Sequence, residues 1–75
     1  MSAAGANRSR ARARRRILQA LYQWQMTGGD VGDIQRQFFS DHRLGHMDLD
    51  YFSEVFRGVT ERVESLDAAY DRYLD

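Results

Sequence analysis

Apolar residues recur at helical spacing along much of this chain, most regularly in its final third. There, successive apolar positions alternate between three and four residues apart, which places them on one face of an α-helix. The positions are Leu49, Phe52, Phe56, Val59, Val63, Leu66, Tyr70 and Tyr73. The pattern predicts one helix of about 25 residues, capped at its start by Asp48. Gly58 lies inside it, where glycine costs about 1 kcal/mol relative to alanine, so we expect a neighbouring helix backbone to approach closely there.

An earlier amphipathic segment predicts a helix from about Arg8 or Arg10 to about Met26. The residues that follow, Thr27 to Gly29, end it, because glycine accepts the left-handed backbone of a helix stop. The expected core face consists of Ile17, Leu21 and Trp24, with Leu18 on its flank.

A short segment between these two predicts another helix. Asp30 is a suitable N-cap for it, and the helix should fade over residues 40–44, before a turn at residues 45–47. Its inner face would carry Val31, Ile34 and Phe38. Three amphipathic helices with short connections predict an all-α fold, a three-helix bundle.

The chain divides into a tail and one small domain. Residues 1–7 carry no periodic signal. Residues 1–9 are expected to form a disordered basic tail and residues 10–75 the helical bundle. The last helix stays apolar on one face to the end of the sequence, so its final apolar residues have no expected cover within this chain. They are Leu66, Tyr70, Tyr73 and Leu74.

The composition excludes several classes of protein. Because the sequence has no cysteine, it offers no disulfide, thiolate nucleophile or sulfur ligand for a metal. This absence fits a reducing compartment, and we expect a cytoplasmic location. The apolar stretches are far shorter than the roughly 20 residues that cross a bilayer, so we expect a soluble protein with no membrane partner.

A formal net charge of zero conceals a strong asymmetry along the chain. Six of the first 16 residues are arginine and none of them is acidic, whereas the residues from Ile17 onward contain five arginines and 11 carboxylates. The basic arm therefore suits phosphates, and the acidic body suits a basic partner.

The arginine run continues into the first predicted helix and forms a ridge on it. A helical projection places five side chains within an arc of roughly 80°. They are Arg8, Arg12, Arg15, Gln19 and Tyr22. Arg10 and Arg14 project along the apolar side instead, and they escape burial only if the helix extends beyond the end of the bundle.

This ridge combines three kinds of group that bind nucleic acid. Its arginines can contact phosphates, the Gln19 amide can bind a base edge, and the Tyr22 ring can stack on an unpaired base. Single-stranded RNA suits the set better than duplex DNA, because stacking requires splayed bases.

Other interpretations of these features remain open. The arginines could form a solvated tail without a defined ligand, or a targeting or membrane-surface segment. Tyr22 could be a boundary tyrosine, and Trp24 is most simply a core residue. The chain could also be a helical protein-interaction module whose long last helix pairs with another helix. A helix-turn-helix DNA reader fits less well, because the basic residues lie at the start of the first helix.

No residue pattern suggests an enzyme or a metal site. His42 and His46 are four residues apart, but a turn separates them and no further ligand completes a set. The carboxylates of Asp48 and Asp50 are explained by a helix N-terminus. We therefore expect no catalytic residue, no metal and no cofactor.

The segment from Arg12 to Gln25 resembles the opening helix of the NusB family of bacterial transcription antitermination factors. That family has a basic arm, an alanine-arginine pair and a Gln-x-Leu-Tyr signature with a tryptophan or similar residue two positions later. Further landmarks match in order along the chain: Asp50-Tyr51-Phe52, Phe56-Arg57-Gly58-Val59, Leu66-Asp67 and Tyr73-Leu74. Two departures occur: Ala11-Arg12 stands where the family usually has two adjacent basic residues, and Arg15 stands at an often acidic position.

The resemblance implies a fold and a function. It implies the amino-terminal half of a two-bundle helical protein that binds boxA-type single-stranded RNA together with NusE, a small-subunit ribosomal protein. The complex would act with RNA polymerase to promote read-through of terminators during ribosomal RNA synthesis. Carried over by position, Arg10, Arg12 and Arg14 would hold RNA phosphates and bases, with Gln19 and Tyr22 alongside. Together with Arg15 of the ridge, these are the candidate RNA-binding residues.

Overall fold

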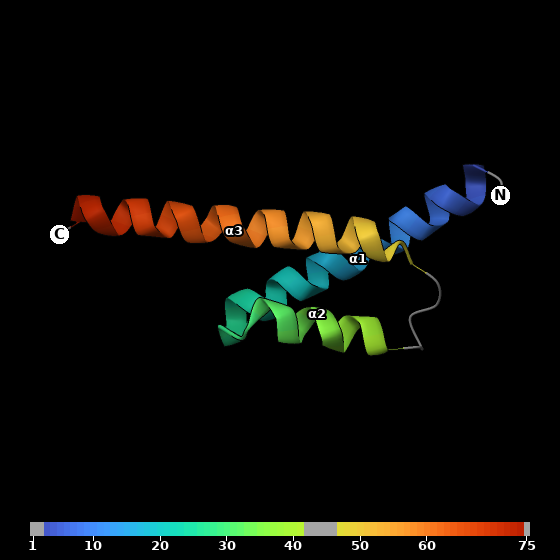
Figure 1. Ribbon diagram of the computed structural model, residues 1–75, viewed down its shortest axis with the longest axis horizontal. Helices are drawn as coiled ribbons and strands as arrows, with labels where there is room; N and C mark the ends of the chain where they lie inside the picture. The colour runs from blue at the N-terminus through green and yellow to red at the C-terminus, as the bar shows by residue number, and fades with distance from the viewer. Residues whose placement is uncertain (1–2, 42–46, 75) are drawn as a thin grey trace.

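A computed structural model describes residues 3–41 and 47–74 of the chain. Within these ranges the elements are α1 (Ala3–Thr27), α2 (Val31–Ser40) and α3 (Leu49–Leu74). Figure 1 shows that α1 and α3 run in the same direction and that α2, which connects them along the chain, runs in the opposite direction. The predicted all-α three-helix bundle is therefore confirmed. The molecule is elongated, with extents of 53 × 22 × 14 Å.

The start of α1 differs from the sequence-based prediction. The helix begins at Ala3, not near Arg8 or Arg10, so the predicted start was wrong by more than one turn. The physical reason is local propensity, because alanine and arginine are strong helix formers and no proline interrupts the segment.

The predicted helix boundaries elsewhere are confirmed. At the end of α1, Gly28 takes a left-handed φ of +66°, and its N–H donates to the carbonyl oxygen of Trp24 at 2.9 Å. Asp30 caps α2 by accepting from the N–H of Asp33 at 3.0 Å. Asp48 caps α3 in the same way, with the N–H of Tyr51 at 3.0 Å from its Oδ1 atom.

The core is small and lies between α1, α2 and the first half of α3. Phe52 is its centre, with ring centroids of Phe38, Phe39 and Phe56 at 5.9, 5.4 and 5.5 Å. The buried apolar residues are Ala13, Ile17, Ala20, Ile34, Met47, Phe52 and Phe56. Trp24 packs against this cluster as a partly buried residue, as do Leu21, Val31 and Phe38.

The apolar stripe predicted for α3 is only partly buried. Phe52 and Phe56 are buried as expected. Thr60, which is not part of the predicted stripe, is also buried, and its hydroxyl donates to the Phe56 carbonyl at 3.0 Å. Leu49, Val59 and Leu66 are exposed. The C-terminal part of α3 extends well beyond the other two helices (Figure 1), so the apolar stripe lacks cover there within the described residues.

Two further expectations about packing were wrong. Leu18 was expected on the flank of the core, but it is 69% exposed because α1 meets its neighbours through Ala13, Ile17 and Ala20. Gly58 was expected at a close helix contact, but a Cβ atom built there would meet nothing within 4 Å.

Some expectations lie outside the described residues. These are residues 42–44, over which the second helix was expected to end, the turn at Gly45 and His46, and the side chains of Tyr70, Tyr73 and Leu74. Among the helices that the structure describes, none combines the length and apolar character of a membrane span.

Candidate nucleic-acid interface

The face of α1 opposite the core carries the ridge predicted from the sequence. Arg8, Arg15, Gln19 and Tyr22 are all exposed on this face, and Arg12 is half-buried. The Gln19 side-chain oxygen accepts a hydrogen bond from Arg16 Nη1 at 3.1 Å. With a rise of 1.5 Å per residue, the ridge extends about 21 Å along the helix. Four of the five ridge side chains are therefore exposed to solvent, and Arg12 is the half-buried one.

Arg10 and Arg14 lie on a different side of α1, facing the start of α3. The guanidinium carbon of each lies 5.9 Å from the centroid of the Tyr51 ring. Arg14 Nε also donates to the Tyr51 hydroxyl in a long contact of 3.4 Å. Both arginines remain exposed although they lie beside α3. The predicted orientation of these two side chains along the apolar side is thus confirmed.

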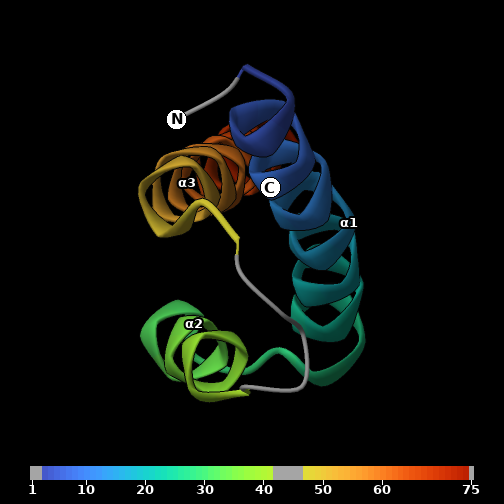
Figure 2. The ribbon, with the colours of Figure 1, turned by 90° about the vertical axis from the view of Figure 1, so that its right-hand side faces the viewer.

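Asp48, the N-cap of α3, also contacts α1. Its backbone N–H donates to the carbonyl oxygen of Ser9 at 3.3 Å, and its Oδ2 atom lies 3.8 Å from Arg10 Nε. The side chains of Arg10 and Asp48 are 57% and 33% exposed, so water screens this ion pair. Figure 2, seen from this end, shows the beginnings of α1 and α3 side by side.

The candidate RNA-binding residues therefore form two groups on one helix. Arg12, Arg15, Gln19 and Tyr22 belong to the open ridge, whereas Arg10 and Arg14 are held beside α3. Sequence reasoning did not associate Tyr51 or Asp48 with the arginines. The only available signal was an aromatic residue next to a helix cap, and that signal says nothing about which side chains of another helix lie nearby.

Tyr22 borders an apolar groove as well as the ridge. The groove lies between α1 and α3 and has a volume of about 350 Å³. Its lining residues are Leu18, Leu21, Tyr22, Trp24, Gln25, Val59 and Val63. The Tyr22 side chain is 65% exposed, so its ring is accessible from both the groove and the ridge.

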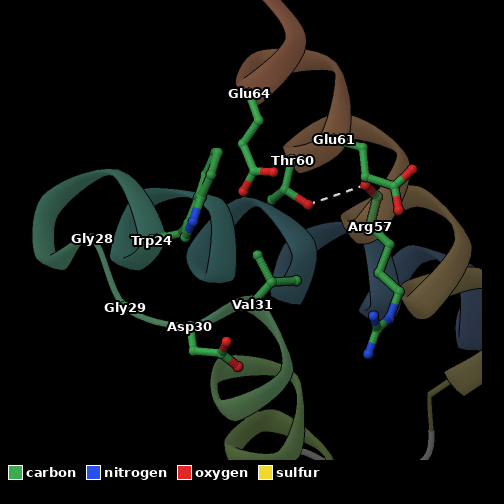
Figure 3. A pocket seen from close by; sticks show the side chains of 9 residues that line it. All are labelled: Trp24, Gly28, Gly29, Asp30, Val31, Arg57, Thr60, Glu61 and Glu64. Atoms are coloured by element: carbon green, nitrogen blue, oxygen red, sulfur yellow. Dashed lines mark hydrogen bonds between the residues drawn. The ribbon is translucent and has the colours of Figure 1, made fainter. Parts of the chain in front are cut away.

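A second hollow of about 350 Å³ opens beside the turn between α1 and α2. Figure 3 shows Trp24 of α1 and Glu64 of α3 extending toward the same opening, with Val31 of α2 nearby. Glu61 and Asp30 add carboxylates to its rim. Arg57 also lines this hollow, but three carboxylates outnumber that one cation, so the hollow does not suit phosphate.

Metal binding has no structural support in the described part of the chain, where no group of three His, Asp or Glu residues is placed to hold an ion. His42 and His46 lie outside the described residues.

The comparisons with known protein families and with individual proteins indicate the same family. The sequence model of the NusB family matches residues 11–75. The protein named "Transcription antitermination protein NusB" from Halorhodospira halophila is 44% identical over 75 residues, which cover 100% of this chain and 48% of that protein. The protein of the same name from Alcanivorax borkumensis is 43% identical over 67 residues, covering 89% of this chain and 45% of the relative. A third, from Psychromonas ingrahamii, is 45% identical over 65 residues, with coverages of 87% and 45%.

The chain thus spans about half the length of the curated relatives it matches. No solved structure matches it significantly.

Proposed function

The chain belongs to the NusB family, and on that premise we propose that it is the RNA-binding portion of a transcription antitermination factor. Its ligand is single-stranded RNA of the boxA type. The contacts come from Arg10, Arg12, Arg14 and Arg15, with Gln19 and Tyr22 beside them. Catalysis, a metal and a cofactor have no part in this function.

The observation that carries the proposal is the coincidence of cations and an accessible ring on one exposed helix. Arg15, Gln19 and Tyr22 are exposed together on the face of α1 that points away from the core. Arginine binds phosphate through a planar fork of donors, and an exposed aromatic ring stacks on an unpaired base. A rigid helix fixes the spacing between these two kinds of contact.

The end of the molecule that carries the arginines has a further electrostatic advantage. Helices α1 and α3 run in the same direction, so their N-termini lie at this end. The positive ends of both helix dipoles therefore add to the arginine charges. Asp48 and Asp50 at the start of α3 offset part of this positive charge, so the arginines of α1 supply most of the attraction for a polyanion.

The acidic body supports the protein partner in the same proposal. Glu61 and Glu64 are exposed on α3 beside the hollow drawn in Figure 3. A basic ribosomal protein such as NusE complements this charge. The assembled complex would act with RNA polymerase in the cytoplasm to promote read-through during ribosomal RNA synthesis.

A triple variant tests the RNA-binding role. Replacing Arg10, Arg12 and Arg14 with alanine should weaken binding of a boxA-type RNA roughly 10- to 100-fold, because three cations near phosphates are lost. Fluorescence anisotropy with labelled RNA measures the affinity, and circular dichroism checks that the helices persist.

The matched control removes the same charge elsewhere. Arg36, Arg57 and Arg62 are exposed residues of α2 and α3, and their replacement by alanine should change the RNA affinity by no more than about twofold at moderate salt. Equal losses in the two triple variants would mean that net charge alone governs binding, and the proposed interface would be wrong.

The apolar groove favours a second candidate function, a helical protein-interaction module. Leu18 and Tyr22 are 69% and 65% exposed at its edge, an unusual position for large apolar side chains next to each other on a helix. This alternative predicts that the arginine variants bind their partner normally and that the melting temperature rises with protein concentration.

A further inference from the structure

We propose that Tyr51, at the start of α3, is a positioning residue for the RNA interface, because its ring holds the guanidinium groups of Arg10 and Arg14 before RNA binds. The inference rests on the proposed function and extends it: the orientation of two cations on α1 depends on a side chain of α3. Family membership gave no reason to assign this role to Tyr51.

The first step is the geometry of the three side chains. Arg10 and Arg14 are one helical turn apart, and their guanidinium carbons lie at the same distance, 5.9 Å, from the centroid of the Tyr51 ring. A cation within about 6 Å of an aromatic centroid is attracted by the negative face of the ring. The Tyr51 hydroxyl adds a polar contact to Arg14 Nε at 3.4 Å.

The second step is that Tyr51 is itself fixed. Its backbone N–H donates to Asp48 Oδ1 at 3.0 Å within the cap of α3, and its ring packs against the hydrophobic core as a partly buried group. The Asp48 N–H in turn donates to the Ser9 carbonyl, one residue before Arg10. The ring and the helix that carries the two cations are therefore locked to the same junction.

The third step is the effect on binding. A free arginine side chain loses rotamer freedom when it is immobilised on a ligand, and this loss weakens association. Contact with a neutral ring restricts the rotamers in advance without neutralising the charge. The N–H donors at the guanidinium edge stay available for phosphate. The ion pair of Arg10 with Asp48 lies at its Nε atom, 3.8 Å from Asp48 Oδ2, and therefore leaves the Nη donors of Arg10 available.

Two substitutions separate the ring from the hydroxyl. Tyr51→Phe keeps the ring and loses only the long contact to Arg14, so RNA affinity should stay within about twofold of wild type. Tyr51→Leu keeps apolar bulk against the core but removes the ring, and RNA should bind about 3- to 10-fold more weakly. The probe is a labelled boxA-type RNA, and circular dichroism monitors the fold of each variant.

A spectroscopic measurement reports on positioning directly and needs no RNA. In wild-type protein, the side-chain NMR signals of Arg10 and Arg14 should show ring-current shifts that Arg15 on the open ridge does not show. These shifts should persist in Tyr51→Phe and vanish in Tyr51→Leu. Because the wild-type spectrum alone shows whether the shifts exist, the test holds even where a variant folds poorly.

A double-mutant cycle then shows whether Tyr51 acts through the arginines. In a protein that already carries Arg10→Ala and Arg14→Ala, adding Tyr51→Leu should weaken RNA binding no further. The positioning role is overturned if wild-type Arg10 and Arg14 show no ring-current shift, or if Tyr51→Leu costs the same affinity in both backgrounds. If the wild-type chain fails to bind the RNA at all, the proposed function is overturned, and that result is distinct because it leaves the shifts in place.

Discussion

At the residue scale, the arginines of the basic arm differ in what holds them. Arg15 is exposed on the open ridge, Arg16 donates to Gln19, and Arg10 contacts both Asp48 and the Tyr51 ring. Residue type and helical projection predicted which side of α1 five of its six arginines occupy, and no side was predicted for Arg16. They could not predict these partners, because a partner on α3 depends on how the two helices cross.

The contact between Arg10 and Asp48 yields a prediction with a defined sign. Asp48→Asn removes a carboxylate that lies 3.8 Å from Arg10 Nε, yet asparagine caps a helix as well as aspartate does. Affinity for boxA-type RNA at low salt should therefore rise about two- to threefold, because phosphate no longer competes with the carboxylate for Arg10. Anisotropy titration measures the change. Weaker binding by this variant would mean that the ion pair orients Arg10 productively.

Tyr22 gives a second prediction at this scale. Its ring is 65% exposed, and stacking of a base on an aromatic ring contributes about 1–3 kcal/mol to binding. Tyr22→Leu should therefore weaken RNA binding by roughly 5- to 100-fold, whereas Tyr22→Phe should bind nearly as wild type. Titrations of both variants under one salt condition make the comparison. An unchanged affinity for Tyr22→Leu would assign the ring to the neighbouring groove instead.

At the scale of elements, the boundaries were more predictable than the buried faces. Gly28, Asp30 and Asp48 all end or cap helices as their residue types indicate, because these effects are local. Burial on α3 was only half predictable. Periodicity identifies which residues share a face, but it does not tell how far the neighbouring helices extend along that face, and α3 extends past both of them (Figure 1).

A substitution at Gly58 tests whether α3 is uncovered at this position. A Cβ atom at this position would meet nothing within 4 Å, and glycine inside a helix is less favourable than alanine. Gly58→Ala should raise the free energy of unfolding of this chain by about 0.5–1 kcal/mol. Urea unfolding followed by circular dichroism measures the difference. A loss of stability would reveal a neighbouring group packed closely against this side of α3.

At the scale of the whole molecule, basic and acidic residues are separated along the long axis. The molecule is 53 Å long, six of its 11 arginines lie within residues 8–16 of α1, and most of its carboxylates lie along α2 and α3. The sequence was sufficient to predict this separation of charge, because six arginines and no acidic residue fall within residues 8–16. The parallel course of α1 and α3, which brings two helix N-termini to the basic end, depends on the return path of α2 and emerged only from the fold.

The salt dependence of RNA binding tests the central claim most directly. If about four arginines neutralise phosphates, a plot of the logarithm of affinity against the logarithm of salt concentration should have a slope of about −3. The variant lacking Arg10, Arg12 and Arg14 should lose about two units of that slope, and the variant lacking Arg36, Arg57 and Arg62 should lose none. A wild-type slope near zero, or equal losses in both variants, would contradict the account.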